Sequence, residues 1–468
     1  MPRRLIMLGA ALEAAAAVFI AVLVSGMSGA DDGMAALSAK AAEAKATSDL
    51  YLRLTDMDAQ AADALLVGYH PTGSVPRDVS APTDMGTYDA QRSAADADLQ
   101  LIGLNPALAA KVKGLLDALG AYESLIGQAV YIDQSTDAEK PAAPPQAALV
   151  LYEQATASMH RDILATASRI RDEDDQEIGD SYTSARDAAF SYAALDALFG
   201  LLLIALIVGA NRYLSLNFRR VVAPALALAA VIAATVTASA VSGLLSTAQD
   251  YRVAKQSAFD SVSALTNAEA VSYDANADES RWLLDRSGPF QDDFFADVDR
   301  IAHVDGVVAA AAAENPDSYY NGLNTATSGL GLNAEWNTVS GVQLGGYLGS
   351  ELSNITFDGE AESADTAANA FNAYIQIDGR IRGFADSGDL ATAVNIDIGR
   401  LPGDSNYQFD AYIKALQNVA GLNQSAFTAA IADGETGLSA WSWLPYPTLA
   451  VLLGLVAAAL YPRLREYR

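Results

Sequence analysis

Residues 244–287 read LLSTAQDYRVAKQSAFDSVSALTNAEAVSYDANADESRWLLDRS, and this stretch decides how the chain is expected to fold. It contains neither glycine nor proline, and apolar side chains recur at heptad-like spacing at Tyr251, Ala258, Val262 and Leu265. That period is typical of a helix with one buried stripe. As a single helix the stretch would reach about 66 Å at a rise of 1.5 Å per residue.

The stretch directly follows an uncharged run, residues 221–245, which is long enough to cross a bilayer. Three more apolar runs occur, and the chain is therefore predicted to be an all-α membrane protein. The first run ends in Ser28-Gly29-Ala30, a small-residue site that also fits a cleaved signal peptide, but its length favours a retained helix. The predicted transmembrane helices are residues 1–29, 188–210, 221–246 and 444–461.

Two long segments separate these spans. Residues 30–187 are predicted to form an extracytoplasmic four-helix bundle, and residues 247–443 a second, mostly helical extracytoplasmic domain. The repeated order of span, long helix, domain and span predicts a parallel duplication. Residues 306–359 are rich in glycine, asparagine and serine, which predicts an irregular insertion with a small hairpin formed by residues 342–348 and 352–357. Helices are expected at 34–67, 83–102, 105–134, 146–178, 290–303, 360–378, 388–398 and 404–432.

Charge predicts the orientation in the membrane. The formal net charge is −28, whereas the short segments 1–4, 211–220 and 462–468 are basic. The positive-inside rule therefore predicts that both termini are cytoplasmic, with 211–220 as a cytoplasmic loop and 462–468 as a cytoplasmic tail. The acidity also excludes nucleic acid as a partner. Two roles are open for these arginines, lipid anchoring and contact with a cytosolic partner; the candidates are Arg212, Arg219, Arg220, Arg463 and Arg465.

Nothing in the sequence indicates catalysis. The cytoplasmic segments are too short for a kinase or nucleotide-binding domain, and no nucleotide or metalloprotease motif is present. The absence of cysteine excludes disulfides and thiolate catalysis. We therefore predict a protein without enzymatic activity, cofactor or metal. The three histidines, His70, His160 and His303, are interpreted as surface or core residues.

Two carboxylates interrupt the apolar runs. Glu13 lies inside the first span, where a charge is costly, and is expected to face other helices. The alternative is a tolerated carboxylate near the cytoplasmic end. Asp196 lies in the outer part of the second span and is interpreted as a residue near the lipid–water boundary.

The best extracytoplasmic candidate is YDANADESRW, residues 273–282. On a helix Asp274, Asp278, Arg281 and Asp285 share one stripe. The stripe is either a solvated face with ion pairs or a polar strip that docks a ligand or a binding protein, and Trp282 is either an interface anchor or a core residue. Two carboxylates alone specify no metal. The candidate binding residues are Asp274, Asn276, Asp278, Glu279, Arg281 and Trp282.

Three stretches resemble a known family: residues 273–285 (YDANADESRWLLD), 211–226 (NRYLSLNFRRVVAPAL) and 49–68 (DLYLRLTDMDAQAADALLVG). The family is an actinobacterial four-pass membrane protein that links an extracytoplasmic glutamate- or glutamine-binding lipoprotein to a cytosolic serine/threonine kinase. The resemblance implies that this chain is a signal transducer relaying amino-acid availability across the membrane. The implied partners are the lipoprotein outside the membrane and the kinase inside. Whether the chain also forms a homo-oligomer is left open by the sequence. The alternative function is a structural or envelope-assembly scaffold, or an accessory subunit of a transporter.

Overall fold

The computed structural model describes residues 2–68, 81–135, 144–218, 223–286 and 288–465. Contacts divide the chain into two compact units. We call Met1–Lys40, Glu177–Gln256 and Ala426–Arg468 the span unit, and Ala41–Gln176 with Ser257–Ser425 the polar unit. The predicted loops at 68–83 and 135–145 lie largely outside the described residues.

Four helical stretches are long and apolar enough to cross a membrane. They contain α1 (Pro2–Val67), α5 (Ala165–Phe218), α6 (Pro224–Arg252) and α15 (Pro445–Arg465). In the described part of the chain the remaining structure is also helical except for one small sheet. The predicted all-α membrane fold with four spans is therefore confirmed.

Two boundaries of the spans differ from the prediction. Residues 211–218 are not a loop but the last two turns of α5, and Gly179 lies inside that helix without ending it. Helix α6 begins at Pro224. Proline is tolerated there because an amide at the start of a helix has no acceptor within the helix. The cytoplasmic connection predicted at 211–220 is consequently reduced to a few residues, of which 219–222 lie outside the described ranges.

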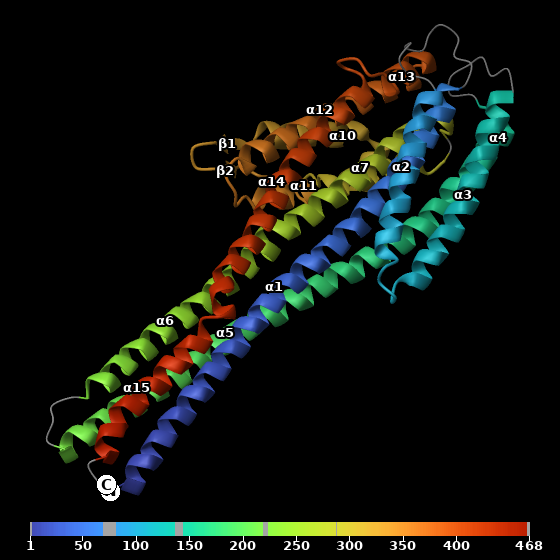
Figure 1. Cartoon of the computed structure of the whole chain (residues 1–468). Coiled ribbons are helices and arrows are strands. Elements are labelled where there is room, and N and C mark those ends of the chain that lie inside the picture. The colour runs from blue at the N-terminus through green and yellow to red at the C-terminus, as the bar shows by residue number, and fades with distance from the viewer. Residues whose placement is uncertain (1, 69–80, 136–143, 219–222, 287, 466–468) are drawn as a thin grey trace. The chain divides into compact units, whose positions relative to one another are not determined.

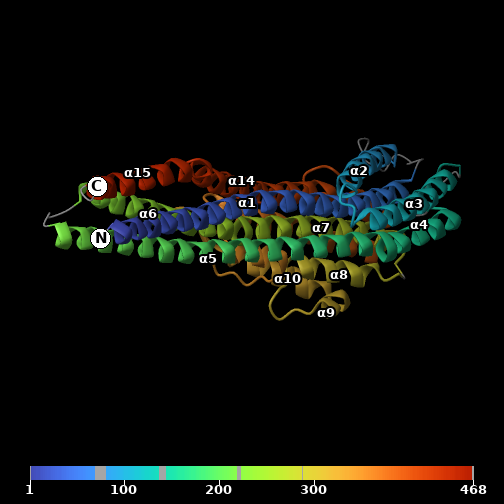
Figure 2. The ribbon, with the colours of Figure 1, turned by 60° about the horizontal axis from the view of Figure 1, so that its bottom comes forward.

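In the span unit, α1, α5, α6 and α15 lie side by side (Figures 1 and 2). Their inward faces form one apolar core that includes Phe19, Leu203, Ala233 and Leu452. Small residues allow close approach, because a side chain at Gly200 would collide with Thr237 of α6. The core thus depends on volume matching between neighbouring helices.

The two acidic residues of the spans have opposite environments. Glu13 is exposed on the surface of the span unit, so the expectation that it faces other helices is wrong. Asp196 is 0% exposed, and neither carboxylate oxygen has a hydrogen-bond partner among the described residues; its predicted position near the lipid–water boundary stays a prediction. The difference arises because apolar composition identifies a span but not the direction in which each side chain points.

The polar unit has two main apolar cores, one from each half of the chain. The first joins the outer turns of α1 to α2 (Ala81–Ile102), α3 (Ala109–Ser135), α4 (Gln146–Ser158) and the start of α5. The second lies against α7 (Asp260–Leu284). Its other helices are α8 (Phe290–Ile301), α9 (Ala309–Glu314), α10 (Pro316–Ser328), α11 (Gly346–Ser353), α12 (Glu360–Asp386) and α14 (Ser405–Ser439). Helix α13 (Leu390–Asp397) packs in a third cluster with the ends of α1 and α7.

The glycine-rich region is more ordered than predicted. A hairpin is present, but it consists of β1 (Gly331–Asn333) and β2 (Thr338–Ser340), paired antiparallel, and not of residues 342–348 and 352–357. Helix α11 instead contains the last three residues of the first predicted strand and the first two of the second. Helix α9 buries Ala312 and Ala313 in the second core, and α10 buries Tyr319 and Leu323 there. This burial outweighs the weak local helix preference of the surrounding residues.

The predicted rod is present as α6, a π-helical segment η2 (Val253–Phe259) and α7, and it ends at Leu284 before Gly288-Pro289. A second π-helical segment, η1 (Met159–Leu164), lies between α4 and α5. A wider π turn changes which residues face a neighbour, and such turns are frequent at functional sites. A short 3₁₀ segment, η3 (Ala440–Ser442), separates α14 from α15.

Gly200 provides a test of the span packing. We expect Gly200→Ala to lower the free energy of unfolding by about 1–3 kcal/mol, because the added methyl group displaces Thr237. Gly209, in the same helix, has nothing within 4 Å of a Cβ position, so Gly209→Ala is the matched control and should not destabilise. Unfolding in mixed detergent micelles measures both. Equal destabilisation by the two variants would contradict the packing described.

Candidate functional site

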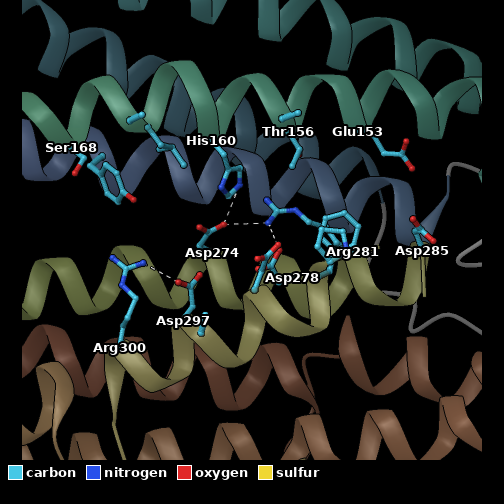
Figure 3. Close-up of a pocket in the computed structure, with 18 residues that line it drawn as sticks. Glu153, Thr156, His160, Ser168, Asp274, Asp278, Arg281, Asp285, Asp297 and Arg300 are labelled. Atoms are coloured by element: carbon cyan, nitrogen blue, oxygen red, sulfur yellow. Dashed lines mark hydrogen bonds and ion pairs between the residues drawn. The ribbon is translucent and has the colours of Figure 1, made fainter. Parts of the chain in front are cut away.

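The polar unit contains a cavity of about 760 Å³. This volume is within the range of small-molecule sites. Its lining comes from α1, from the α4–η1–α5 stretch, from α7 and its C-terminal end, and from α8 (Figure 3). Its polar and charged lining residues include Glu153, Thr156, His160, Asp274, Asp278, Arg281, Asp285, Asp293, Asp297 and Arg300.

Helix α7 contributes one stripe of side chains to the cavity. Asp274, Asp278 and Arg281 follow one another at helical spacing, and Asp285 comes directly after the last residue of the helix. Asp278 and Arg281 are 3% and 1% exposed, so this part of the stripe is buried. The predicted ion pairs are present, but the interpretation of the stripe as a solvated face is wrong.

Helix α8 forms the neighbouring wall of the cavity. Asp293, Asp297 and Arg300 lie on its cavity side at spacings of four and three residues. Phe294, Phe295, Val298 and Ile301, on its other side, are buried in the second core. This amphipathic division fixes the rotation of α8 and thereby aims its two carboxylates and its arginine at the cavity.

The third wall comes from α4, η1 and α5. Glu153 and Thr156 belong to α4, and His160 lies in the π-helical segment. Figure 3 shows His160 pointing across the cavity toward Asp274. The Nε2 atom of His160 is 3.4 Å from an oxygen of Asp274 and 3.6 Å from an oxygen of Asp58.

Arg281 joins the two halves of the polar unit. Its Nη1 donates to Asp278 at 2.6 Å and to Asp274 at 3.2 Å, both on its own helix. Its Nη2 donates to Asp58 of α1, and its Nε donates to the hydroxyl of Tyr152 in α4 at 3.0 Å. One guanidinium thus binds three helices, and all three of its nitrogens are occupied.

Asp58 is the main anionic partner of Arg281. Besides the arginine, it accepts hydrogen bonds from the Tyr122 hydroxyl at 2.8 Å and the Thr156 hydroxyl at 3.0 Å. Burial alone would raise the pKa of Asp58, but Arg281, His160 and these donors outweigh it and lower the pKa to about 2. Asp58 is therefore ionised at neutral pH.

His160 carries the complementary charge. Burial opposes its protonation, but Asp274 and Asp58 outweigh this effect and raise the pKa of His160 to about 9. The cavity consequently presents an imidazolium at neutral pH. The interpretation of His160 as an ordinary surface or core residue does not fit this position, since the ring lines the cavity between two carboxylates.

Three carboxylates converge at the floor of the cavity. Oxygens of Asp274, Asp278 and Asp297 lie within 4.8 Å of one another. Burial, and then the neighbouring carboxylates, raises the pKa of Asp297 to about 7, and burial raises that of Asp278 well above its ordinary range. Such raised values show that this arrangement favours an added positive charge, whether a proton or a cationic group.

The remaining predicted site residues lie elsewhere. Asn276 and Glu279 are buried on the other face of α7, where Glu279 accepts from Ser405 of α14 at 2.9 Å. Trp282 is a core residue, 4% exposed, with the guanidinium groups of Arg286 and Arg382 at 4.3 and 4.5 Å from its ring centroid. The predicted strip is thus divided between two faces of one helix.

Of the basic candidates for a cytosolic contact, Arg212 is exposed on α5, and Arg463 and Arg465 lie in the last turn of α15. Arg219 and Arg220 lie outside the described residues.

Four important residues were not singled out from the sequence: Asp58, His160, Asp297 and Arg300. The last two could have been found, because Asp293, Asp297 and Arg300 repeat the spacing of Asp274, Asp278 and Arg281. Asp58 and His160 could not, since only the packing of α1 and η1 against α7 brings them to the arginine.

The fold and the cavity define a helical membrane protein with a ligand-sized polar site. Residues 33–183 match the family model of the actinobacterial sensor domain. This match and the four apolar helices support an actinobacterial sensor protein of the membrane. The matched residues include Asp58, Thr156 and His160 but not α7 or α8. No curated protein and no solved structure matches the chain.

The buried arginine provides a test of the site. We expect Arg281→Met to lower the free energy of unfolding by about 3–5 kcal/mol, because it leaves buried carboxylates without a counter-charge. Arg161→Met is the control, since Arg161 is exposed and pairs only with the exposed Asp162 among the described residues. Adding Asp58→Asn to Arg281→Met should recover part of the loss. Equal stability of Arg281→Met and wild type would contradict the role assigned to this network.

Proposed function

We propose that this chain is a non-enzymatic transmembrane sensor that receives its signal in the cavity of the polar unit and relays it to a cytosolic kinase. The sensor role rests on the family match over residues 33–183. The receiving site rests on the cavity between α7, α8 and the α4–η1–α5 stretch. The kinase, and an amino-acid-binding lipoprotein as the extracytoplasmic partner, rest on the family resemblance of the sequence.

The observation that carries the proposal is the composition of the cavity wall. Its carboxylates outnumber its cationic groups, and Arg281 is already bonded through all three nitrogens. A ligand with a positively charged nitrogen would add counter-charge beside Asp274, Asp278 and Asp297, which are only partly neutralised by their arginine and histidine partners. Arg300 and the imidazolium of His160 would then suit a second, anionic group of the same ligand.

A ligand in this cavity would contact both halves of the polar unit. His160 belongs to the half that contains α1–α5, whereas Asp274 and Asp297 belong to the half that begins with the rod. A ligand that neutralises the carboxylates changes the balance of the ion pairs that hold α7 and η1 together. If the ligand binds one packing of α7 against η1 more tightly than another, this difference in affinity shifts the equilibrium between the two packings.

The relay requires an orientation and an inner contact. The positive-inside bias places the termini and the connection after α5 in the cytoplasm. Arg212, Arg463 and Arg465 lie toward the ends of the apolar helices α5 and α15. In this orientation they are available to a cytosolic partner.

Ligand binding can be tested with the purified full-length protein in detergent. The probes are L-glutamate, L-glutamine, L-lysine, 1,4-diaminobutane and calcium chloride, and thermal unfolding is the readout. We expect an amine-bearing probe to stabilise the protein, by about 2.7 kcal/mol at 100 times its Kd. Asp297→Asn should abolish the stabilisation, because it removes a carboxylate of the proposed ammonium site.

Asp299→Asn is the matched control. Asp299 lies in the same helix but pairs with His303, and it is not part of the cavity lining. Its variant should respond to the probes as the wild type does. A lack of response to every amine probe, or an undiminished response in Asp297→Asn, would contradict the proposed site, and a response to calcium alone would indicate a metal site instead.

A further inference from the structure

The second polar face of α7 contains a cluster of buried carboxyl groups that the proposed function does not use. Its members come from four helices: Asp63 of α1, Glu279 of α7, Asp378 of α12 and Asp397 of α13. Each is at most 4% exposed. We call these four residues, with Ser280, the carboxyl cluster.

The contacts of Ser280 point to a proton held by the carboxyl cluster. Its Oγ lies 2.8 Å from an oxygen of Asp63 and 3.0 Å from an oxygen of Asp397. A hydroxyl has a single hydrogen and donates it to only one of the two oxygens. Protonation of the other carboxyl, which then donates to Ser280, satisfies both contacts, whereas two ionised groups would have to share one hydrogen.

The carboxyl cluster has too few cations for its acids. Arg382 is bonded to Asp378 at 2.9 Å, and Asp378 also accepts from the Tyr320 hydroxyl at 2.5 Å. Glu279 accepts from the hydroxyls of Ser405 at 2.9 Å and Tyr374 at 3.3 Å. One oxygen each of Glu279, Asp378 and Asp397 has no hydrogen-bond partner among the described residues. Buried charges without partners are strongly unfavourable, so this packing requires protonated acids.

The surrounding charges do not change this conclusion. Burial, and then the neighbouring carboxylates, raises the pKa of Glu279 and Asp397 well above the ordinary range, and burial raises that of Asp63. Near Asp63, Arg400 is 3.9 Å from an oxygen of Asp84 and offsets the carboxylates only in part. The charged groups that face the carboxyl cluster are Asp56 on α1, Asp84 on α2, Arg382 on α12 and Arg400 after α13.

We infer that the carboxyl cluster is a proton-binding site that makes the docking of α13 against α1 and α7 depend on the pH around the polar unit. When the shared proton leaves to solvent, Asp63 and Asp397 repel each other across Ser280. The short helix α13 is the element that yields, because it has only eight residues and is buried through Ala393, Val394 and Ile396, which pack with the ends of α1 and α7 and with α12. Gly388 and Gly403, with φ of +88° and +98°, flank it and allow the backbone to turn.

The sign of the effect follows from the raised pKa values of Glu279 and Asp397. In the docked state these carboxyls keep protons that an undocked, solvated carboxyl releases near its ordinary pKa of about 4. Docking is therefore most stable at acidic pH and weakens as the pH rises toward the pKa of the buried groups. An acidic environment therefore favours docked α13, and an alkaline environment favours undocked α13.

Hydrogen exchange of the full-length protein in nanodiscs tests this inference without a ligand or a partner. The readout is the protection of residues 390–397, corrected for the intrinsic pH dependence of exchange. For each proton released we expect protection to fall about tenfold per pH unit between about pH 5 and about pH 7. Asp397→Asn, which keeps the shape and can donate to Ser280, should flatten this dependence.

Glu279→Gln is a second variant and should also reduce the slope of protection against pH. With two variants, the test still works if one of them fails to fold. Asp386→Asn is the control, because Asp386 is exposed on α12 and pairs with Arg286. It should keep the slope of the wild type. Protection that is independent of pH in the wild type, or an unchanged slope in both Asp397→Asn and Glu279→Gln, would overturn the proton-binding site.

Discussion

The polar unit depends on a single constraint: the guanidinium of Arg281 is buried and must keep its anionic partners. The arginine is 1% exposed and binds Asp58, Asp274 and Asp278 as well as Tyr152. Removing such a group from water is unfavourable unless every donor is satisfied. The requirement therefore fixes the position of α7 relative to α1 and α4, and this packing leaves the cavity beside α8 open.

The sequence predicted correctly those features that depend on the residue pattern within a single helix. Apolar runs predicted the four spans, and heptad-like spacing predicted the rod from α6 to α7. It was less informative at residues 306–359, because their glycine and asparagine content is typical of loops, whereas Tyr319 and Leu323 pack into a core made by distant helices. The hairpin was predicted but misplaced for the same reason.

In the candidate site, too, features set within one helix were predicted and contacts between distant helices were not. Spacing along one helix brought Asp274, Asp278 and Arg281 together correctly, because the pattern depends only on α7. It could not show that Asn276 and Glu279 face different neighbours, nor that Asp58 and His160 complete the ion-pair network. Those contacts join residues more than 100 positions apart, as in the pairs Arg281–Asp58 and His160–Asp274.

Two polar clusters lie on opposite faces of α7, and they favour opposite protonation states of their carboxyl groups. On one face Arg281 holds Asp58 ionised, and on the other the carboxyl cluster favours protonated groups. A ligand cation would act on the first face and a proton on the second, and both would change how α7 is held. In the function proposed here, α7 would thus combine two chemical signals before any relay to the cytoplasm.

The relay itself is tested most directly by capturing the tagged full-length protein from its own cells in mild detergent and identifying the associated proteins by mass spectrometry. The account predicts a solute-binding lipoprotein together with a cytosolic serine/threonine kinase. It further predicts that Arg212→Gln combined with Arg463→Gln loses the kinase but keeps the lipoprotein. Recovery of transporter subunits or cell-wall enzymes alone would contradict the account and favour a scaffold.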